Sequence, residues 1–416
     1  MVVVVVAALL ALLGAGAGPA TAAGEAIEGT LSAGAQPVPD VTVTATLTGA
    51  APITVKSDAT GHFAFPLTGG PGTYVVRLDV ATLPKGVTVA AGAPNPLTIL
   101  VTAGQTRAAL FRLDKAGFTA ARSQTIKSLQ LLVDGIKLGL IIAMAAVGLS
   151  LVFGTTGLTN FAHGDLVTLG ALVAYFFNVT VGMPFLLAAV LSLVVCSAAN
   201  GLLDLGLWRP LKRRGTGLIA ALVVSIGLSL FLRYLYLFFF GGSAKPFASY
   251  SAQQPYDLTY ITITPKDLTV DIVSVVVLVA VGLALQRSRL GTAIRAVADN
   301  KDLAAASGIA VDRVVTIVWI TGGGLAALGG IFLGLLQENR WDMGFTLLLL
   351  IFAGVTLGGL GTAYGALLGG VLIGVLTNLS TLVIPSELKN VGALAVLVLV
   401  LLVRPTGLLG RRERIG

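Results

Sequence analysis

Two patterns of apolar and polar residues divide the chain. Residues 41–48 alternate between apolar and polar side chains with a period of two, which is typical of a half-buried β-strand. From about residue 131 the apolar runs are long, and Leu166–Leu203 and Met343–Ser386 contain no charged residue. A membrane-spanning helix needs about 20 apolar residues, so each stretch is long enough for two crossings. The pattern predicts a polytopic α-helical membrane protein preceded by an all-β domain.

Residues 24–115 form the predicted β domain. Besides 41–48, strands are predicted at 62–65 and 74–80, where apolar and aromatic residues recur at short spacing. Turn residues separate them at 37–40, 58–61, 69–72 and 84–86. Short strands at this spacing favour an antiparallel β-sandwich of about 90 residues.

The N-terminal part also has features of exported proteins. Residues 1–23 are mostly apolar and end in the small residues Thr21-Ala22-Ala23, which predicts a signal peptide. An uncleaved first helix is the alternative, because no positive side chain precedes the apolar core. The β domain resembles the carboxypeptidase-regulatory-like sandwiches of exported proteins. The resemblance rests on Gly29, Pro39–Val43, Ser57–Phe63 and Pro71–Tyr74. We therefore expect an exported sandwich, joined to the membrane part by a connector at 116–130.

The transmembrane domain is predicted at 131–403. The glycine-rich segments 164–181 and 344–362 also fit partly re-entrant segments, so the prediction is eight or nine crossings. The apolar runs lie at about 131–153, 164–181, 184–207, 216–240, 268–286, 313–336, 344–362, 364–384 and 388–403.

The charges orient these crossings. The net charge is +8, and most lysines and arginines of the membrane part lie at 209–214, at 287–313 and in the tail 404–416. These are the segments that nine crossings starting outside would place in the cytoplasm, where basic residues are enriched. We therefore predict an outside β domain and a cytoplasmic C-terminus. The excess of positive charge is not a nucleic-acid footprint.

The composition excludes several classes of site. With 56% apolar and 11% charged residues the chain is not an ordinary soluble enzyme. The single cysteine, Cys196, lies in an apolar run and predicts a small buried side chain. The two histidines are far apart, so we expect no metal site and no cofactor. No phosphate-binding P-loop or hydrolase motif occurs, so the chain is not expected to be an enzyme or to hydrolyse ATP.

The segment between Arg287 and Arg313 is the first candidate for function. It predicts a short amphipathic helix with small residues, ended by Gly308. Such a helix suits a groove in another protein, and a solvated loop helix is the alternative. The composition of the segment leaves both open.

This segment resembles the coupling loop of the permease subunits of branched-chain amino acid ABC importers. Leu290, Gly291, Ala293 and Arg295–Ala298 match the first half of that motif, and Asp302, Leu303, Ala304, Gly308 and Ile309 occupy its second half. Asp302 stands where the family has Glu, and Leu303 where it has Ala. The resemblance implies that the helix docks on cytoplasmic ATP-binding subunits and transmits their closure. The predicted coupling residues are Gly291, Arg295, Asp302, Leu303, Ala304 and Gly308.

Three further stretches are similar to the same family. They are Gly154–Asp165, Phe352–Ala366 and Leu402–Gly410, so the resemblance covers about 125–412. In the second stretch, Gly358, Gly359, Gly361 and Gly365 are predicted to pack helices closely.

In the first stretch, Asn160, His163, Gly164 and Asp165 are predicted to lie along or to gate the transport pathway. Polar groups at membrane depth often mark a pathway. The alternative is structural: Asn160 or Asp165 caps a helix, and His163 bonds a backbone carbonyl. Arg233 is predicted to extend outward to the membrane surface.

The predicted function is the permease subunit of an ATP-driven ABC importer for branched-chain or related amino acids. The resemblance implies ATP-binding subunits, a homologous second permease, an extracytoplasmic solute-binding protein and a bacterial plasma membrane. The same kind of permease for urea or short amides stays open. So does a membrane-anchored surface-binding or sensor protein, in which the sandwich binds a ligand.

Overall fold

The computed structural model describes residues 26–33, 36–47, 50–67, 69–89, 94–101, 106–109, 111, 113–115, 124–247, 256–258, 261–385, 388–403 and 407–410. The predicted signal peptide and most of the predicted tail lie outside these residues. The chain divides into a β unit, which takes in residues 17–130 and 248–265, and a helical unit of residues 131–247 and 266–416. Each unit has its own hydrophobic core.

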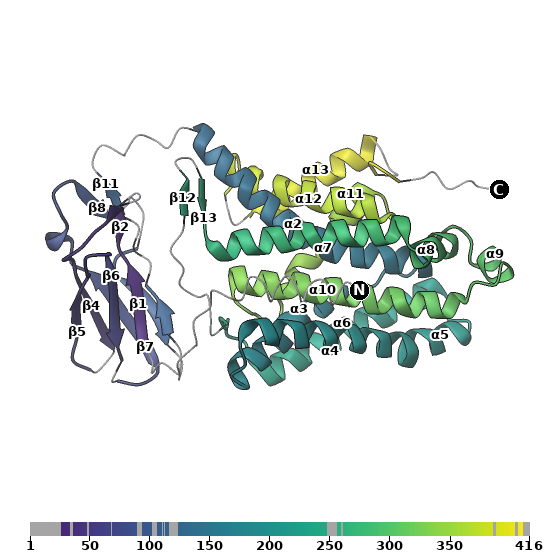
Figure 1. Ribbon diagram of the computed structural model, residues 1–416, viewed down its shortest axis with the longest axis horizontal. Helices are drawn as coiled ribbons and strands as arrows, with labels where there is room; N and C mark the ends of the chain where they lie inside the picture. The colour runs from purple at the N-terminus through teal and green to yellow at the C-terminus, as the bar shows by residue number, and fades with distance from the viewer. Residues whose placement is uncertain are drawn as a thin grey trace. The chain divides into compact units, whose positions relative to one another are not determined.

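The β unit contains short strands, as the alternating pattern predicts (Figure 1). Hydrogen bonds join them in the orders β10-β1-β6, β3-β2-β11-β8, β5-β4-β7-β9 and β12-β13. The strands are β1 (Ala26–Thr30), β2 (Ser32–Ala33), β3 (Gln36–Pro37), β4 (Thr42–Leu47), β5 (Ile53–Lys56), β6 (His62–Pro66), β7 (Gly72–Leu78), β8 (Val87–Val89), β9 (Leu97–Val101), β10 (Thr106–Ala108), β11 (Leu113–Lys115), β12 (Tyr256–Leu258) and β13 (Ile261–Ile263).

The predicted strands at 41–48 and 62–65 are confirmed by β4 and β6. The strand predicted at 74–80 corresponds to β7, but it ends at Leu78, because Asp79 caps a short 3-10 helix that begins at Val80. The inward positions of these three strands bury Val43, Phe63 and Tyr74 among the core residues of the unit. The predicted turn at 58–61 precedes β6. There the Asp58 carboxylate accepts hydrogen bonds from the Thr60 hydroxyl and amide and from the His62 amide, and these bonds lower the pKa of Asp58.

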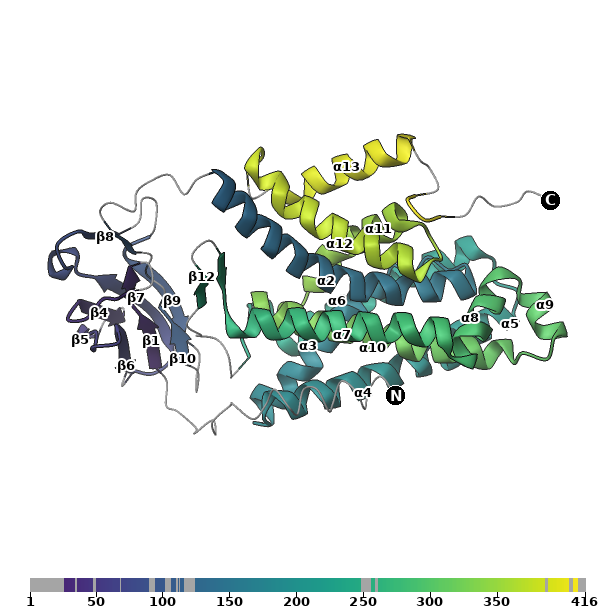
Figure 2. The same ribbon diagram turned by 45° about the horizontal axis from the view of Figure 1, so that its top comes forward.

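The β unit also contains the short 3-10 helix η2 (Val80–Thr82), and the helical unit contains the other elements (Figures 1 and 2). They are α2 (Gln124–Thr156), α3 (His163–Tyr175), η3 (Phe176–Thr180), α4 (Phe185–Leu203), η4 (Asp204–Trp208), α5 (Arg209–Arg213), α6 (Leu218–Phe240), α7 (Pro265–Arg287), α8 (Arg289–Asp299), α9 (Lys301–Ala306), α10 (Val311–Gln337), α11 (Met343–Gly358), α12 (Ala363–Leu379), η5 (Ser380–Leu382) and α13 (Lys389–Val403). The elements η3 and η4 are π-helical continuations of α3 and α4.

Six helices among the described residues are long and apolar enough to cross a membrane. They span 126–156, 185–213, 218–240, 265–287, 311–337 and 363–382. The other predicted crossings correspond to the shorter helices α3, α11 and α13. The predicted connector at 116–130 differs from the structure at its end, because α2 already begins at Gln124. Hydropathy marks only the apolar part of a helix, and residues 124–130 are mostly polar.

Small residues bring the helices of the unit into backbone contact. A Cβ atom at Gly148 of α2 would lie 2.6 Å from the carbonyl oxygen of Gly322 in α10, and one at Gly170 of α3 would lie 2.3 Å from Ala327 Cα. Helix α10 is consequently buried along most of its length, whereas α6 exposes large apolar side chains. Cys196 of α4 is buried, as predicted.

The four glycines predicted to pack helices divide into two pairs. A Cβ atom at Gly358 would lie 1.8 Å from the carbonyl oxygen of Gly365, so this pair holds α11 against α12. Gly359 and Gly361 lie in the loop between these helices, with φ angles of 113° and 78°. Side chains disfavour such φ values, so these two positions require glycine for the turn.

Candidate functional site

The break between α2 and α3 is the first candidate region. Helix α2 ends at Thr156, and the chain turns at Gly157, which has a φ of 75°. The Phe161 amide then donates to Ser225 Oγ of α6 over 3.1 Å. Ser225 is seven residues beyond the first residue of α6, which corresponds to about 10 Å along that helix. The connection therefore follows α6 inward, and α3 begins well inside the bundle.

Asn160 and His163 hold this break in place. The Asn160 side-chain oxygen accepts from the Ala162 amide at 3.1 Å, and His163 Nε2 lies 2.9 Å from the carbonyl oxygen of Ala145 in α2. Because a carbonyl oxygen only accepts, the ring nitrogen donates in this bond. Both side chains are about 1% exposed. These contacts are those of the structural alternative, in which the polar groups bond the backbone of their own chain.

Asp165, the third residue of α3, forms a buried network with α6. Its carboxylate accepts from the Ser229 hydroxyl and lies 3.4 Å from Arg233 Nε, while its backbone oxygen accepts from the Tyr236 hydroxyl at 3.1 Å. The Arg233 guanidinium also lies 3.4 Å from the centre of the Phe345 ring in α11, a cation–π arrangement. The network therefore joins α3, α6 and α11.

The prediction for Arg233 is wrong. Its side chain is 12% exposed and turns inward to Asp165 instead of extending to the membrane surface. Burial of either charge alone is costly, and the partner carboxylate is the reason for the inward position. A pattern on α6 indicates this: Ser225, Ser229, Arg233 and Tyr236 recur on one helical face. The sequence interpretation considered Arg233 alone and missed Ser229 and Tyr236.

Gly164 places α3 against α11. A Cβ atom at Gly164 would lie 2.5 Å from the carbonyl oxygen of Gly344, and one at Gly344 would lie 1.9 Å from that of Gly164. Thr168 Oγ1 accepts from the Gly344 amide at 3.0 Å. The polar cluster and this glycine contact are thus parts of one packed junction.

The segment after α7 is the second candidate region, and it forms the helices α8 and α9. Ser288 caps α8 by accepting from the Gly291 amide at 2.9 Å, and Asn300 caps α9 by accepting from the Leu303 amide at 2.9 Å. Such caps satisfy amide groups that a helix start leaves unpaired. Gly291 is needed because a Cβ atom there would lie 2.2 Å from the carbonyl oxygen of Leu285.

Three of the predicted coupling residues maintain the shape of this helix pair. The Arg295 guanidinium donates to the Leu285 carbonyl at the end of α7, so it fixes α8 against α7. Ala304 is 3% exposed and is the buried residue of α9. Gly308 follows α9 with a φ of 84°, a left-handed residue that ends the helix.

Leu303 and Asp302 face outward. The Leu303 side chain is 66% exposed, and Asp302 is exposed in the first turn of α9. An apolar side chain this exposed on a short surface helix is an available contact for another molecule.

Lys301 links the two candidate regions. Its ammonium group lies 3.1 Å from the carbonyl oxygen of Thr156, the last residue of α2. Partial burial lowers the pKa of Lys301, the nearby Lys212 lowers it further, and Asp302 partly opposes this. The sequence motif did not single out Lys301. The structure thus connects α9 directly to the break that precedes α3.

The comparisons with known proteins place most of the helical unit in one family. Residues 131–402 match the family model described as branched-chain amino acid transport system / permease component. No solved structure matches the chain significantly.

Relatives with curated names match most of the same part. The high-affinity branched-chain amino acid transport system permease protein LivH of Escherichia coli K12 is 32% identical over 305 residues, which cover 70% of this chain and 98% of the relative. LivH of Salmonella typhimurium is 31% identical over 316 residues, with the same coverage. BraD of Pseudomonas aeruginosa is 30% identical over 298 residues, covering 68% and 96%. The chain therefore belongs to the family of branched-chain amino acid transport permeases, and it is a multi-pass membrane protein.

Proposed function

We propose that this chain is the membrane subunit of an ATP-driven importer for branched-chain or related amino acids. The observation that carries the proposal is the helix pair α8–α9, which exposes Leu303 on one side and is bound through Lys301 to the end of α2 on the other. A short helix with an exposed apolar side chain fits a groove in a partner protein. Because the sequence has no P-loop, the ATP is hydrolysed by partner subunits.

In the proposed cycle, closure of the ATP-binding subunits displaces α9. The hydrogen bond from Lys301 to the Thr156 carbonyl passes this displacement to the connection between α2 and α3. Asn160, His163, Gly164 and Asp165 keep that connection in a fixed shape, so they position the helices instead of contacting the solute. In this cycle the chain changes the side of the membrane to which the transport pathway is open, and it carries out no covalent chemistry.

The remaining parts of the proposal concern partners and orientation. A homologous second permease completes the pathway, and an extracytoplasmic binding protein delivers the amino acid. The chain lies in the bacterial plasma membrane with the β unit outside and the C-terminus in the cytoplasm. The distribution of Lys and Arg between segments supports this orientation.

Reconstitution tests the proposal. The chain, the second permease and the ATP-binding subunits are inserted in proteoliposomes, and uptake of labelled leucine and of labelled urea is measured with the binding protein and ATP. We expect ATP-dependent uptake of leucine. Uptake of urea without leucine would overturn the substrate class, and uptake without ATP would overturn the importer mechanism.

A matched pair of variants tests the coupling role. Asp302→Ala is expected to abolish ATP-driven uptake while the amount of folded protein stays unchanged, because Asp302 is exposed. Asp302→Glu keeps the carboxylate and is expected to retain uptake. Normal uptake by Asp302→Ala would overturn the assignment of α9.

A further inference from the structure

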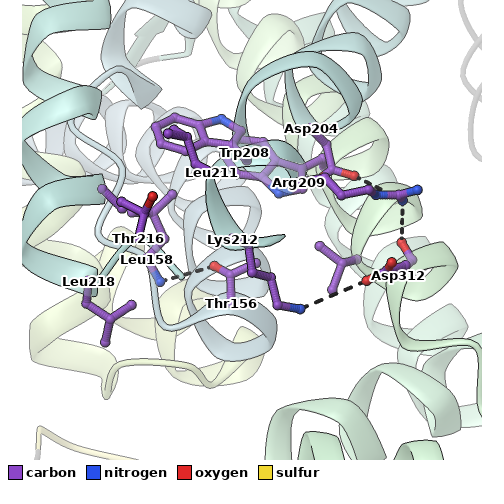
Figure 3. A pocket seen from close by; sticks show the side chains of 13 residues that line it. Thr156, Leu158, Asp204, Trp208, Arg209, Leu211, Lys212, Thr216, Leu218 and Asp312 are labelled. Carbon is purple, nitrogen blue, oxygen red and sulfur yellow. Dashed lines mark hydrogen bonds and ion pairs between the residues drawn. The ribbon is translucent and has the colours of Figure 1, made fainter. Parts of the chain in front are cut away.

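A pocket lies beside the end of α2, apart from the Asp165 network. It has a volume of about 90 Å³ and is formed by the end of α2, the connection to α3, the η4–α5 segment and the first turns of α6 and α10 (Figure 3). We call it the tryptophan pocket, after Trp208 and Trp319, which line it. The two indole rings stack with centroids 5.6 Å apart and an interplanar angle of 13°.

One part of the lining is apolar. Besides the two indoles, Leu158, Leu218 and Val315 line the pocket. Among the described residues, neither Trp208 Nε1 nor Trp319 Nε1 has a hydrogen-bond partner, although both atoms are buried. A buried donor without an acceptor costs about 1–3 kcal/mol. Because both atoms are closed to solvent, the indoles contribute apolar surface to the lining.

The other part of the lining is charged and balanced. Asp204 and Asp312 provide two negative charges, and Arg209 and Lys212 provide two positive charges. Asp204 is 3% exposed on its side chain and lies 3.6 Å from Arg209, while Lys212 lies 4.0 Å from Asp312. Figure 3 shows Asp204, Arg209 and Asp312 on one side, Leu158 and Leu218 on the other, and Lys212 between them. A lining with no net charge favours a ligand that carries both signs over a net anion or cation.

We propose that the tryptophan pocket binds a zwitterionic α-amino acid with an aliphatic side chain. The ligand's ammonium group faces the two aspartates, its carboxylate faces Arg209 and Lys212, and its side chain packs on the apolar part. This inference rests on the proposed function and names a second place for the solute, on the side of the bundle where α9 lies. Thr156 lines the pocket, and its carbonyl accepts the hydrogen bond from Lys301 of α9, so a ligand in the pocket contacts the residue to which α9 is bound.

Intrinsic fluorescence tests the pocket, because the sequence contains three tryptophans and two of them are in it. Trp341→Phe leaves Trp208 and Trp319 as the only reporters in the full chain. L-leucine is titrated into this variant in lipid nanodiscs, and the emission and the near-ultraviolet circular dichroism of the stacked pair are followed. We expect a saturable change in both signals.

Ligand analogues and variants make the test specific. 4-Methylpentanoate is leucine without the ammonium group, and isoamylamine is leucine without the carboxylate. Each should need at least about tenfold higher concentration than leucine, the loss expected for one charged hydrogen-bonding group. Asp312→Asn and Lys212→Gln should each raise the half-saturating leucine concentration several-fold. Both side chains are about half exposed, so these variants are expected to fold. Arg340→Gln changes an exposed charge that does not line the pocket and should leave the titration unchanged.

The outcomes separate this inference from the proposed function. Leucine uptake in proteoliposomes without a saturable signal in the nanodiscs overturns the pocket and leaves the transport proposal standing. A saturable signal without ATP-driven leucine uptake supports the pocket and overturns the proposed function. Equal binding of leucine, 4-methylpentanoate and isoamylamine overturns the zwitterion assignment.

Discussion

Asp165 and Asp302 occupy equivalent local positions in two very different surroundings. Each lies in the first turn of a helix, Asp165 in α3 and Asp302 in α9, where a carboxylate is favoured by the partial positive charge of the helix start. Asp165 is fully buried and bound by Ser229 and Arg233. Asp302 is exposed.

The comparison shows what the surroundings add to the same helix position. The Asp165 carboxylate bonds side chains of its own chain, and its removal leaves the positive charge of Arg233 buried without a partner. The Asp302 carboxylate lies beside exposed Leu303, so it is available to a partner. We therefore expect changes near Asp165 to affect stability, and changes on α9 to affect coupling.

The largest effect is expected for Asp165→Asn. This change keeps the size of the side chain but leaves the buried Arg233 without a counter-charge, which costs about 3–5 kcal/mol of unfolding free energy. Denaturant unfolding of the purified chain in detergent measures the loss. The double variant Asp165→Asn/Arg233→Gln should recover part of it. A double variant as unstable as the single one would show that the charges do not act as a pair.

Gly344→Ala is expected to have the second-largest effect on stability. The added Cβ would lie 1.9 Å from the Gly164 carbonyl oxygen, so α3 and α11 must separate, at a cost of about 1–3 kcal/mol. Gly227→Ala on α6 is the matched control, because a Cβ atom there meets no atom within 4 Å. The same unfolding assay compares the two. Equal stabilities would contradict the close contact at the Asp165 junction.

In the exposed region around α9, Gly308→Ala should lower the free energy of unfolding by about 1 kcal/mol. Alanine disfavours the left-handed φ of 84° at this position. Gly308→Asn is the control, since asparagine tolerates this conformation better and should cost less. Thermal unfolding ranks the three proteins. If alanine and asparagine are equally tolerated, backbone conformation is not why glycine is needed there.

The smallest effect on stability is expected for Leu303→Ser. The side chain is 66% exposed, so the unfolding free energy should change by less than about 0.5 kcal/mol. ATP-driven leucine uptake should nevertheless fall strongly, because the proposed apolar contact with the ATP-binding subunits is lost. Unchanged uptake would show that α9 has no special role in coupling, in contrast to the expectation from its exposed side chains.

The sequence predicted the two classes of structure because each has a strong periodic signal. Alternation at 41–48 predicted β4, and long apolar runs predicted the six helices that are long enough to cross a membrane. The motif around Arg295 and Gly308 predicted a helical segment ended by glycine, and the structure adds that it forms two helices with a cap at Asn300.

The contacts between distant segments could not be predicted from the sequence. The pairing of Asp165 with Arg233 joins residues 68 positions apart, and hydropathy carries no information on which faces meet. The same holds for Lys301 and Thr156, 145 positions apart. The tryptophan pocket joins five segments whose individual patterns indicate only ordinary membrane helices and loops.

Helix α2 has one further consequence for movement. It contacts α10 at Gly148 and Gly322 and contacts α12 at Gly139 and Gly374, mainly through backbone atoms. Glycine has no rotamers, so at these four positions a small slide of α2 requires no side-chain rearrangement. The barrier to such a slide then comes from the buried side chains of α2, such as Ile141, Ile142 and Met144. A pull at Thr156 would then be carried along α2 as the displacement of a whole helix.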